Sequence, residues 1–91
     1  MLDMDTFVYV LKLEDECWYV GYSTQIIHRL RQHFSGLGAK WTQMHKPIKL
    51  FCLYPVVDVE EAKKLEKIVT SEYVSKYGQD AIRGTPTVSA T

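Results

Sequence analysis

Two strand-like segments joined by an acidic turn constrain this chain more than any other feature of its sequence. Residues 6–13 (TFVYVLKL) and 17–22 (CWYVGY) are rich in β-branched and aromatic side chains, and the turn between them is Glu-Asp-Glu. This arrangement predicts an antiparallel β-hairpin. Side chains alternate between the two faces of a strand, so any even register places Tyr9 and Tyr19 on the same face. The hairpin therefore predicts a pair of phenols on one side of a sheet.

The segments that follow the hairpin predict an α/β (α+β) fold. Ser23 or Thr24 is expected to cap a helix that ends near Gly36, and residues 39–45 are typical of a second, short helix. Residues 49–57 are apolar on both faces, which predicts a third strand in a sheet that helices cover on both sides. We therefore expect a small three-stranded antiparallel sheet flanked by helices.

A long helix is predicted over residues 59–77, with Asp58 and Glu61 as a capping box at its start and Gly78 at its end. Its apolar stripe consists of Val59, Ala62, Leu65, Val69 and Tyr73. At about 100° per residue, Glu66 lies near the centre of this stripe. An inward carboxylate is costly unless something compensates it, and either a metal ion or a structural partner such as Arg or Tyr would do so.

Size and composition indicate one small domain. The chain has 91 residues, and we expect a folded domain over residues 1–84 and a flexible tail over residues 85–91, which are small and polar. No apolar run approaches the ~20 residues that span a membrane, and no secretion signal is recognisable. Cys17 and Cys52 lack metal-ligand spacing and are interpreted as reduced thiols. These features predict an intracellular protein without a membrane partner.

The formal net charge of zero conceals a segregation of charge. Residues 17–57 contain no Asp or Glu. The basic residues of this block are Arg29, Arg31, Lys40, Lys46 and Lys49, and all three histidines also lie in it. The block could present a basic face to phosphates, with Arg31, Lys40 and Lys46 as contacts to nucleic acid, or it could be an ordinary solvated surface. Charge alone does not separate these two interpretations.

Several of these residues, in their order and spacing, resemble the GIY-YIG nuclease family. Phe7-Val8-Tyr9 stands at the Gly-Ile-Tyr triplet and retains its Tyr, and Tyr19-Val20-Gly21 stands at the Tyr-Ile-Gly triplet. The Arg-Leu-x-x-His pattern of residues 29–33 and Glu66, in the helix after the third strand, also match. The resemblance runs from about residue 6 to about residue 84. One departure is Ala81, which stands where many members carry an Asn.

The resemblance implies a metal-dependent DNA endonuclease whose products carry a 5′-phosphate and a 3′-hydroxyl. By this resemblance Tyr9 takes the proton of the attacking water with support from Tyr19, and a nearby Arg29 and metal ion are expected to favour the phenolate. Arg29 holds the phosphate, His33 bonds a tyrosine or the phosphate, and Glu66 is the protein ligand of Mg²⁺ or Mn²⁺. All five are expected in one concave, water-accessible site, with Arg31 outside it.

Two other functions remain open at this point. The same fold could be a nucleic-acid-binding module with weak or no catalysis, or a metal-free protein-interaction domain in which Glu66 has a structural partner. Members of the family act in DNA repair, recombination, homing and restriction, usually with specificity supplied by an additional domain. DNA is thus the expected partner, with an additional DNA-binding domain or partner protein as a possible source of specificity.

Overall fold

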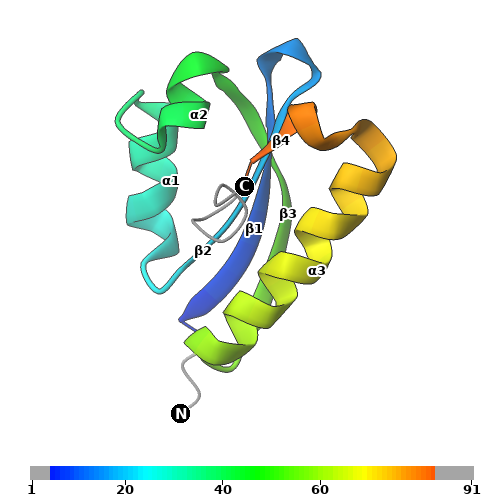
Figure 1. Cartoon of the computed structure of the whole chain (residues 1–91). Coiled ribbons are helices and arrows are strands. Elements are labelled where there is room, and N and C mark those ends of the chain that lie inside the picture. The colour runs from blue at the N-terminus through cyan, green and yellow to red at the C-terminus, as the bar shows by residue number, and fades with distance from the viewer. Residues whose placement is uncertain (1–4, 84–91) are drawn as a thin grey trace.

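The computed structural model describes residues 5–83 of the chain (Figure 1). The strands are β1 (Thr6–Leu13), β2 (Trp18–Ser23), β3 (Pro47–Val56) and β4 (Ile82–Arg83). The helices are α1 (Ile26–Phe34), α2 (Lys40–Met44) and α3 (Val59–Tyr77), and short 3₁₀ turns cover Glu14–Glu16 and Gln79–Ala81. The predicted tail over residues 85–91 lies outside the described residues, so its flexibility stays a prediction.

The predicted hairpin is confirmed, and its register decides where the tyrosines lie. Strands β1 and β2 are antiparallel, with Tyr9 opposite Gly21 and Leu11 opposite Tyr19. This register is even, so Tyr9 and Tyr19 lie on one face of the sheet. Asp15 and Glu16 in the turn both have left-handed backbone angles, with φ of 63° and 59°.

The predicted α/β (α+β) class and the antiparallel pairing of β1, β2 and β3 are confirmed. The predicted number of three strands is wrong, because the sheet has four strands in the order β3-β1-β2-β4. The additional strand β4 pairs parallel with β2, with Trp18 opposite Ile82 and Tyr19 opposite Arg83. A strand of two residues is too short to show a periodicity of two. Its pairing depends on the turn after α3, which returns the chain to the edge of β2.

Strand β3 lies at the other edge of the sheet, and its expected burial between helices is wrong. Leu50, Phe51 and Leu53 are exposed to 36%, 46% and 43%. Its pairing with β1 is interrupted by register shifts at Val10/Leu11 and at Lys12/Leu13 of β1. Such irregularities are common at sheet edges, where they bend the bulged strand. The apolar side chains of β3 therefore belong to an edge strand that the helices leave partly exposed.

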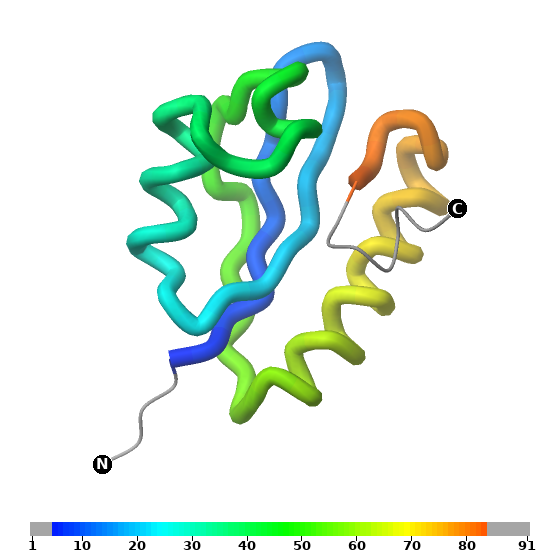
Figure 2. Tube along the Cα trace, turned by 60° about the vertical axis from the view of Figure 1, so that its left-hand side comes forward, coloured from blue at the N-terminus to red at the C-terminus, as the bar shows by residue number. Residues whose placement is uncertain are grey.

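Helices cover the centre of the sheet on both faces. Helices α1 and α2 lie on one face and α3 lies on the other, as both views show (Figures 1 and 2). Alternate residues of the hairpin supply the two cores. The core beneath α3 contains Val8, Val10, Trp18, Val20, Val56, Ala62, Val69 and Ile82. The core beneath α1 and α2 contains Tyr9, Leu11, Leu13, Cys17 and Tyr19.

The helix boundaries follow local signals with one exception. Helix α3 begins and ends where predicted, and the side chain of Asp58 accepts a hydrogen bond from the Glu61 amide at 2.9 Å. The expected cap of α1 is wrong, because Gln25 is its N-cap and makes no side-chain cap bond. Ser23 instead accepts a bond from the Gln25 amide, which forms a local turn before the helix.

Two expectations about the whole chain can be compared with the described part. Cys17 and Cys52 are both free, as expected for reduced thiols. Over residues 5–83, no helix combines the length and the apolar character that a membrane crossing requires.

Candidate active site

Tyr9, Tyr19 and His33 form a tight aromatic cluster between the hairpin and α1. The ring centroids of Tyr19 and His33 are 4.9 Å apart, and those of Tyr9 and Tyr19 are 6.1 Å apart. Tyr9 and His33 are hydrogen-bonded, with 2.8 Å between the phenol Oη and the imidazole Nε2. The even register of the hairpin and the packing of α1 on that face bring the three rings together.

Arg29 adds a positive charge to this cluster. It precedes His33 by one helical turn, so the two side chains share a face of α1. Its charge acts on the phenols of both Tyr9 and Tyr19, where it lowers the pKa against the larger opposing effect of burial. Its Nη1 also donates a hydrogen bond of 2.9 Å to Oε1 of Gln32. Arg31 is exposed, and no interaction with the cluster is seen for it.

Glu66 approaches the same phenols from α3, in the other helical layer. Its side chain is 1% exposed, as its place in the apolar stripe predicts. Its negative charge raises the pKa of both Tyr9 and Tyr19, which indicates that the carboxylate lies within electrostatic reach of the two hydroxyls. The structure therefore brings Tyr9, Tyr19, Arg29 and His33 together in one cluster, and the charge of Glu66 reaches the two phenols from the other helical layer.

The protonation states of this cluster differ from the expectation of a phenolate. The pKa of Tyr9 is raised, first by burial and then by the neighbouring Tyr19, and the charge of Arg29 only partly offsets this. Burial also lowers the pKa of His33 from 6.5 to about 4, with the charge of Arg29 as the second cause. At neutral pH both rings are therefore uncharged in the free protein. Arg29 lowers the pKa of Tyr9 as expected, but burial raises it by more, so Arg29 alone does not produce a phenolate. The joint effect of Arg29 and a metal ion stays a prediction.

The expectation of a water-accessible site is wrong for four of the five residues. Tyr9 and His33 are 0% exposed, Glu66 is 1% exposed and Tyr19 is 3% exposed, whereas Arg29 is partly exposed. Both faces of the hairpin are covered by helices, so aromatic residues at its centre lose their contact with water.

Two glycines allow this close packing. A Cβ atom at Gly21 would lie 2.8 Å from Tyr9 Oη and 2.9 Å from Tyr19 Cε2. A Cβ atom at Gly38 would collide with Nδ1 of His33 and lie 2.9 Å from its Cα atom. Gly21 belongs to one of the two triplets singled out from the sequence, whereas Gly38 belongs to no such motif. No local pattern in the sequence reveals that Gly38 packs directly against His33.

Thr42, like Gly38, contacts His33 and was not singled out as functional from the sequence. It lies on α2, is 1% exposed, and its Oγ1 is 3.1 Å from Nδ1 of His33. The available signal in the sequence is its position four residues after Gly38, which packs against His33.

The basic residues expected to contact nucleic acid lie outside the cluster. Arg31, Lys40 and Lys46 are all exposed. A cavity of about 480 Å³ between the end of α1 and α2 brings Lys46 near His33 and Thr42. The acid-free block thus supplies positive charge on the same side of the sheet as the aromatic cluster.

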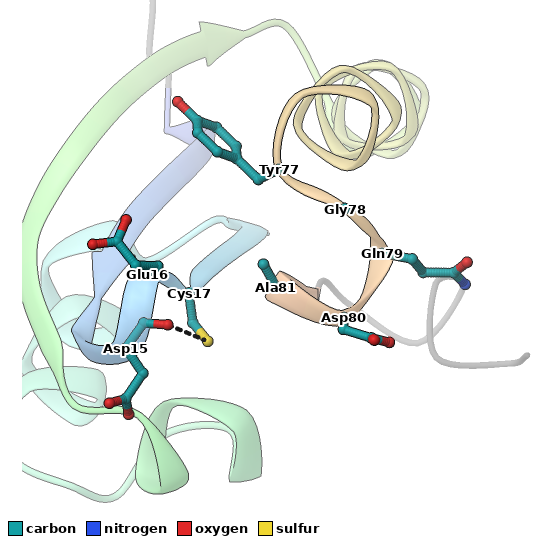
Figure 3. Close-up of a pocket in the computed structure, with 8 residues that line it drawn as sticks. All are labelled: Asp15, Glu16, Cys17, Tyr77, Gly78, Gln79, Asp80 and Ala81. Carbon is teal, nitrogen blue, oxygen red and sulfur yellow. Dashed lines mark hydrogen bonds between the residues drawn. The ribbon is translucent and has the colours of Figure 1, made fainter.

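A larger cavity of about 680 Å³ lies elsewhere and contains none of the five residues. It lies between the hairpin turn and the end of α3 (Figure 3). The carboxylates of Asp15, Glu16 and Asp80 point in different directions there. Within residues 5–83, no group of three or more His, Cys, Asp or Glu side chains could hold a metal ion. That finding applies to the aromatic cluster as well, so among the described residues neither place is a metal site built from three such side chains.

Comparisons with known proteins identify the family of this chain. The model of the GIY-YIG catalytic domain matches residues 6–78. A UPF0213 protein of Halalkalibacterium halodurans is 38% identical over 63 residues, which are 69% of this chain and 67% of that protein. A UPF0213 protein of Streptococcus pneumoniae is 37% identical over 68 residues, which are 75% and 69% of the two chains. No solved structure matches this chain.

Proposed function

This chain belongs to the GIY-YIG nuclease family, and on that basis we propose that it is a metal-dependent DNA endonuclease. It would hydrolyse a phosphodiester bond to leave a 5′-phosphate and a 3′-hydroxyl. The observation that carries the proposal is the cluster of Tyr9, Tyr19, Arg29 and His33, with the buried carboxylate of Glu66 in electrostatic reach of both phenols. This set combines a phosphate-binding guanidinium, groups that can pass a proton and one carboxylate.

In the proposed reaction Arg29 binds the non-bridging oxygens of the scissile phosphate, because its planar fork can donate two parallel hydrogen bonds. Its partial exposure leaves it accessible to a substrate, unlike the four buried residues. Tyr9 is 0% exposed, so the site must open to admit the attacking water. Tyr9 then accepts a proton from this water as its own proton passes to Nε2 of His33, 2.8 Å away. The water oxygen bonds to phosphorus, the P–O3′ bond breaks, and the leaving 3′ oxygen takes a proton from solvent.

This relay avoids a buried phenolate. Burial raises the pKa of Tyr9, so a free phenolate would be costly at neutral pH. A phenol that gains one proton while it gives up another stays neutral throughout. Tyr19, which packs against both Tyr9 and His33, would hold the two rings in the geometry that this transfer requires.

Glu66 would hold the divalent cation, Mg²⁺ or Mn²⁺. The donor type fits such an ion, because one carboxylate is a hard oxygen ligand and leaves the other coordination positions to water and phosphate oxygens. When bound, the cation neutralises the charge that develops on the scissile phosphate and the leaving oxygen.

Arg31, Lys40 and Lys46 would contact the DNA backbone from the face that carries α1 and α2. The burial of Tyr9 and Glu66 supports one alternative, a nucleic-acid-binding module of the same fold with weak or no catalysis. Both functions require phosphate contacts, so affinity for DNA should fall with salt in either case. Specificity for a DNA structure, as in repair or recombination, would come from an additional domain or a partner protein.

The test is a cleavage panel with single-stranded, duplex, flap and branched DNA in Mg²⁺ or Mn²⁺. We expect the wild type to cut at least one substrate and Glu66→Gln to cut none, because the amide keeps the volume but removes the charge that binds the cation. Glu60→Gln is the matched control, since it removes an exposed carboxylate from the same helix and should cleave like the wild type.

Circular dichroism of the three proteins would establish that they share one fold. Undiminished cleavage by Glu66→Gln with the same metal dependence would contradict the assignment of Glu66. Salt-sensitive DNA binding by a wild type that cuts no substrate would support the binding module instead.

A further inference from the structure

His33 can receive a proton from Tyr9 only if its Nε2 atom carries a free lone pair. A neutral imidazole has one protonated nitrogen and one acceptor nitrogen, and the bonds around the ring decide which is which. The ring of His33 is 0% exposed, so its protein neighbours set the choice. Those neighbours are Tyr9 at Nε2 and Thr42 at Nδ1.

The hydroxyl of Thr42 fixes the direction of its bond with His33. Oγ1 of Thr42 donates its single hydrogen to the backbone carbonyl of Ala39, at 2.8 Å. A carbonyl oxygen can only accept, so this hydrogen is not available to His33. Oγ1 must therefore accept from Nδ1–H of His33, at 3.1 Å. Nδ1 then carries the hydrogen of the neutral ring, and Nε2 accepts from the Tyr9 hydroxyl.

We propose that Thr42 is a positioning residue that sets the tautomer of His33, so that His33 faces Tyr9 as a proton acceptor. Ala39 holds the Thr42 hydroxyl, Thr42 holds Nδ1–H, and Gly38 packs directly against the same edge of the ring. The assignment of a proton-accepting role rests on the proposed nuclease function. The assignment of the tautomer rests only on the hydrogen bonds.

The tautomer can be measured directly by nitrogen NMR on protein labelled with ¹⁵N-histidine. The protonated and unprotonated nitrogens of a neutral imidazole have well-separated shifts, and comparison with His33→Gln identifies the signals of His33. We expect a protonated Nδ1 in the wild type and in Thr42→Ser, which retains the hydroxyl. In Thr42→Val the buried Nδ1–H loses its acceptor, so the population should move toward the tautomer with hydrogen on Nε2.

Cleavage rates provide the second measurement. With Nε2 protonated, His33 can no longer accept from Tyr9, so Thr42→Val should cut about tenfold more slowly or worse, whereas Thr42→Ser should restore the rate. Thr70→Val is the control for loss of a buried threonine hydroxyl. The Oγ1 atom of Thr70 is buried without a hydrogen-bond partner, so this variant should leave the His33 tautomer unchanged.

The outcomes separate this proposal from the nuclease assignment. A wild type with hydrogen on Nε2 would overturn the proposal, and so would a folded Thr42→Val that keeps hydrogen on Nδ1. If Thr42→Val does not fold, the tautomers of the wild type and Thr42→Ser still decide the direction of the bond. A wild type with the expected tautomer that cuts no DNA would refute the nuclease function and leave the positioning by Thr42 intact.

Discussion

His33, a buried histidine of α1, should make the stability of the folded state depend on pH. Burial, and secondly the charge of Arg29, lower the pKa of His33 from 6.5 to about 4. Between these two values the unfolded chain binds a proton at His33 that the folded protein does not bind. The stability that this group contributes is therefore complete above pH 6.5 and is lost as the pH falls toward 4.

The magnitude follows from the size of the shift. One pH unit within this window costs about 1.4 kcal/mol in the free energy of unfolding. At a pH of about 5, which is roughly 1.5 units below the unfolded value, the loss should be about 2 kcal/mol. The ring is 0% exposed, so solvent screening does not reduce this figure. A loss of that size is a large part of the stability of a small domain.

Urea unfolding followed by tryptophan fluorescence would measure the effect at neutral pH and at a pH of about 5. His33→Gln should lose about 2 kcal/mol less than the wild type over this interval. His28→Gln should behave like the wild type, because His28 is exposed. An equal loss in the wild type and His33→Gln would refute the argument. If His33→Gln does not fold, an NMR titration of His33 that gives a pKa near 6.5 would refute it equally.

Three further predictions follow from the site and its surroundings. Arg29→Lys should slow cleavage far more than it weakens DNA binding, because lysine lacks the bidentate fork of arginine beside Tyr9. Arg31→Lys, on the exposed surface, should change the cleavage rate and the DNA affinity only slightly, and similar kinetics for the two variants would contradict the assignment of Arg29. Gly21→Ala should destabilise the protein by about 1–3 kcal/mol in thermal unfolding, because its Cβ would crowd Tyr9, and unchanged stability would be inconsistent with the packing. Thr70→Val should be neutral or raise stability by up to about 1 kcal/mol, since no hydrogen bond is lost; a clear destabilisation would reveal an unseen partner.

The elements that follow local signals could be predicted from the sequence. The hairpin follows from two β-branched segments around an acidic turn, and α3 follows from its capping box, apolar stripe and terminal glycine. The inward direction of Glu66 also follows from helical periodicity alone. The family pattern then connected Glu66 with Tyr9 and Arg29, which are far apart in the sequence.

Features that depend on long-range packing could not be predicted in this way. Strand β4 forms because the turn after α3 returns residues 82–83 to the edge of β2. Two residues are too few to show the alternation of a strand in the sequence. The apolar sequence of β3 suggested burial, yet an edge position gives the same sequence a different environment. The part that Thr42 plays depends on the contact of α2 with α1, which brings its hydroxyl to His33. The protonation of Tyr9 depends on a balance between burial and charge that spacing does not reveal.

The location of Glu66 in a separate helical layer bears on thermal inactivation. The other four site residues come from the hairpin and α1, whereas Glu66 comes from α3, which packs on the opposite face through residues such as Ala62 and Val69. Segments of a protein can open locally at a smaller free-energy cost than global unfolding. A transient detachment of α3 would withdraw the carboxylate and leave the hydrogen-bonded tyrosine and histidine in place. Heating would then abolish cleavage at or below the temperature at which the sheet itself melts.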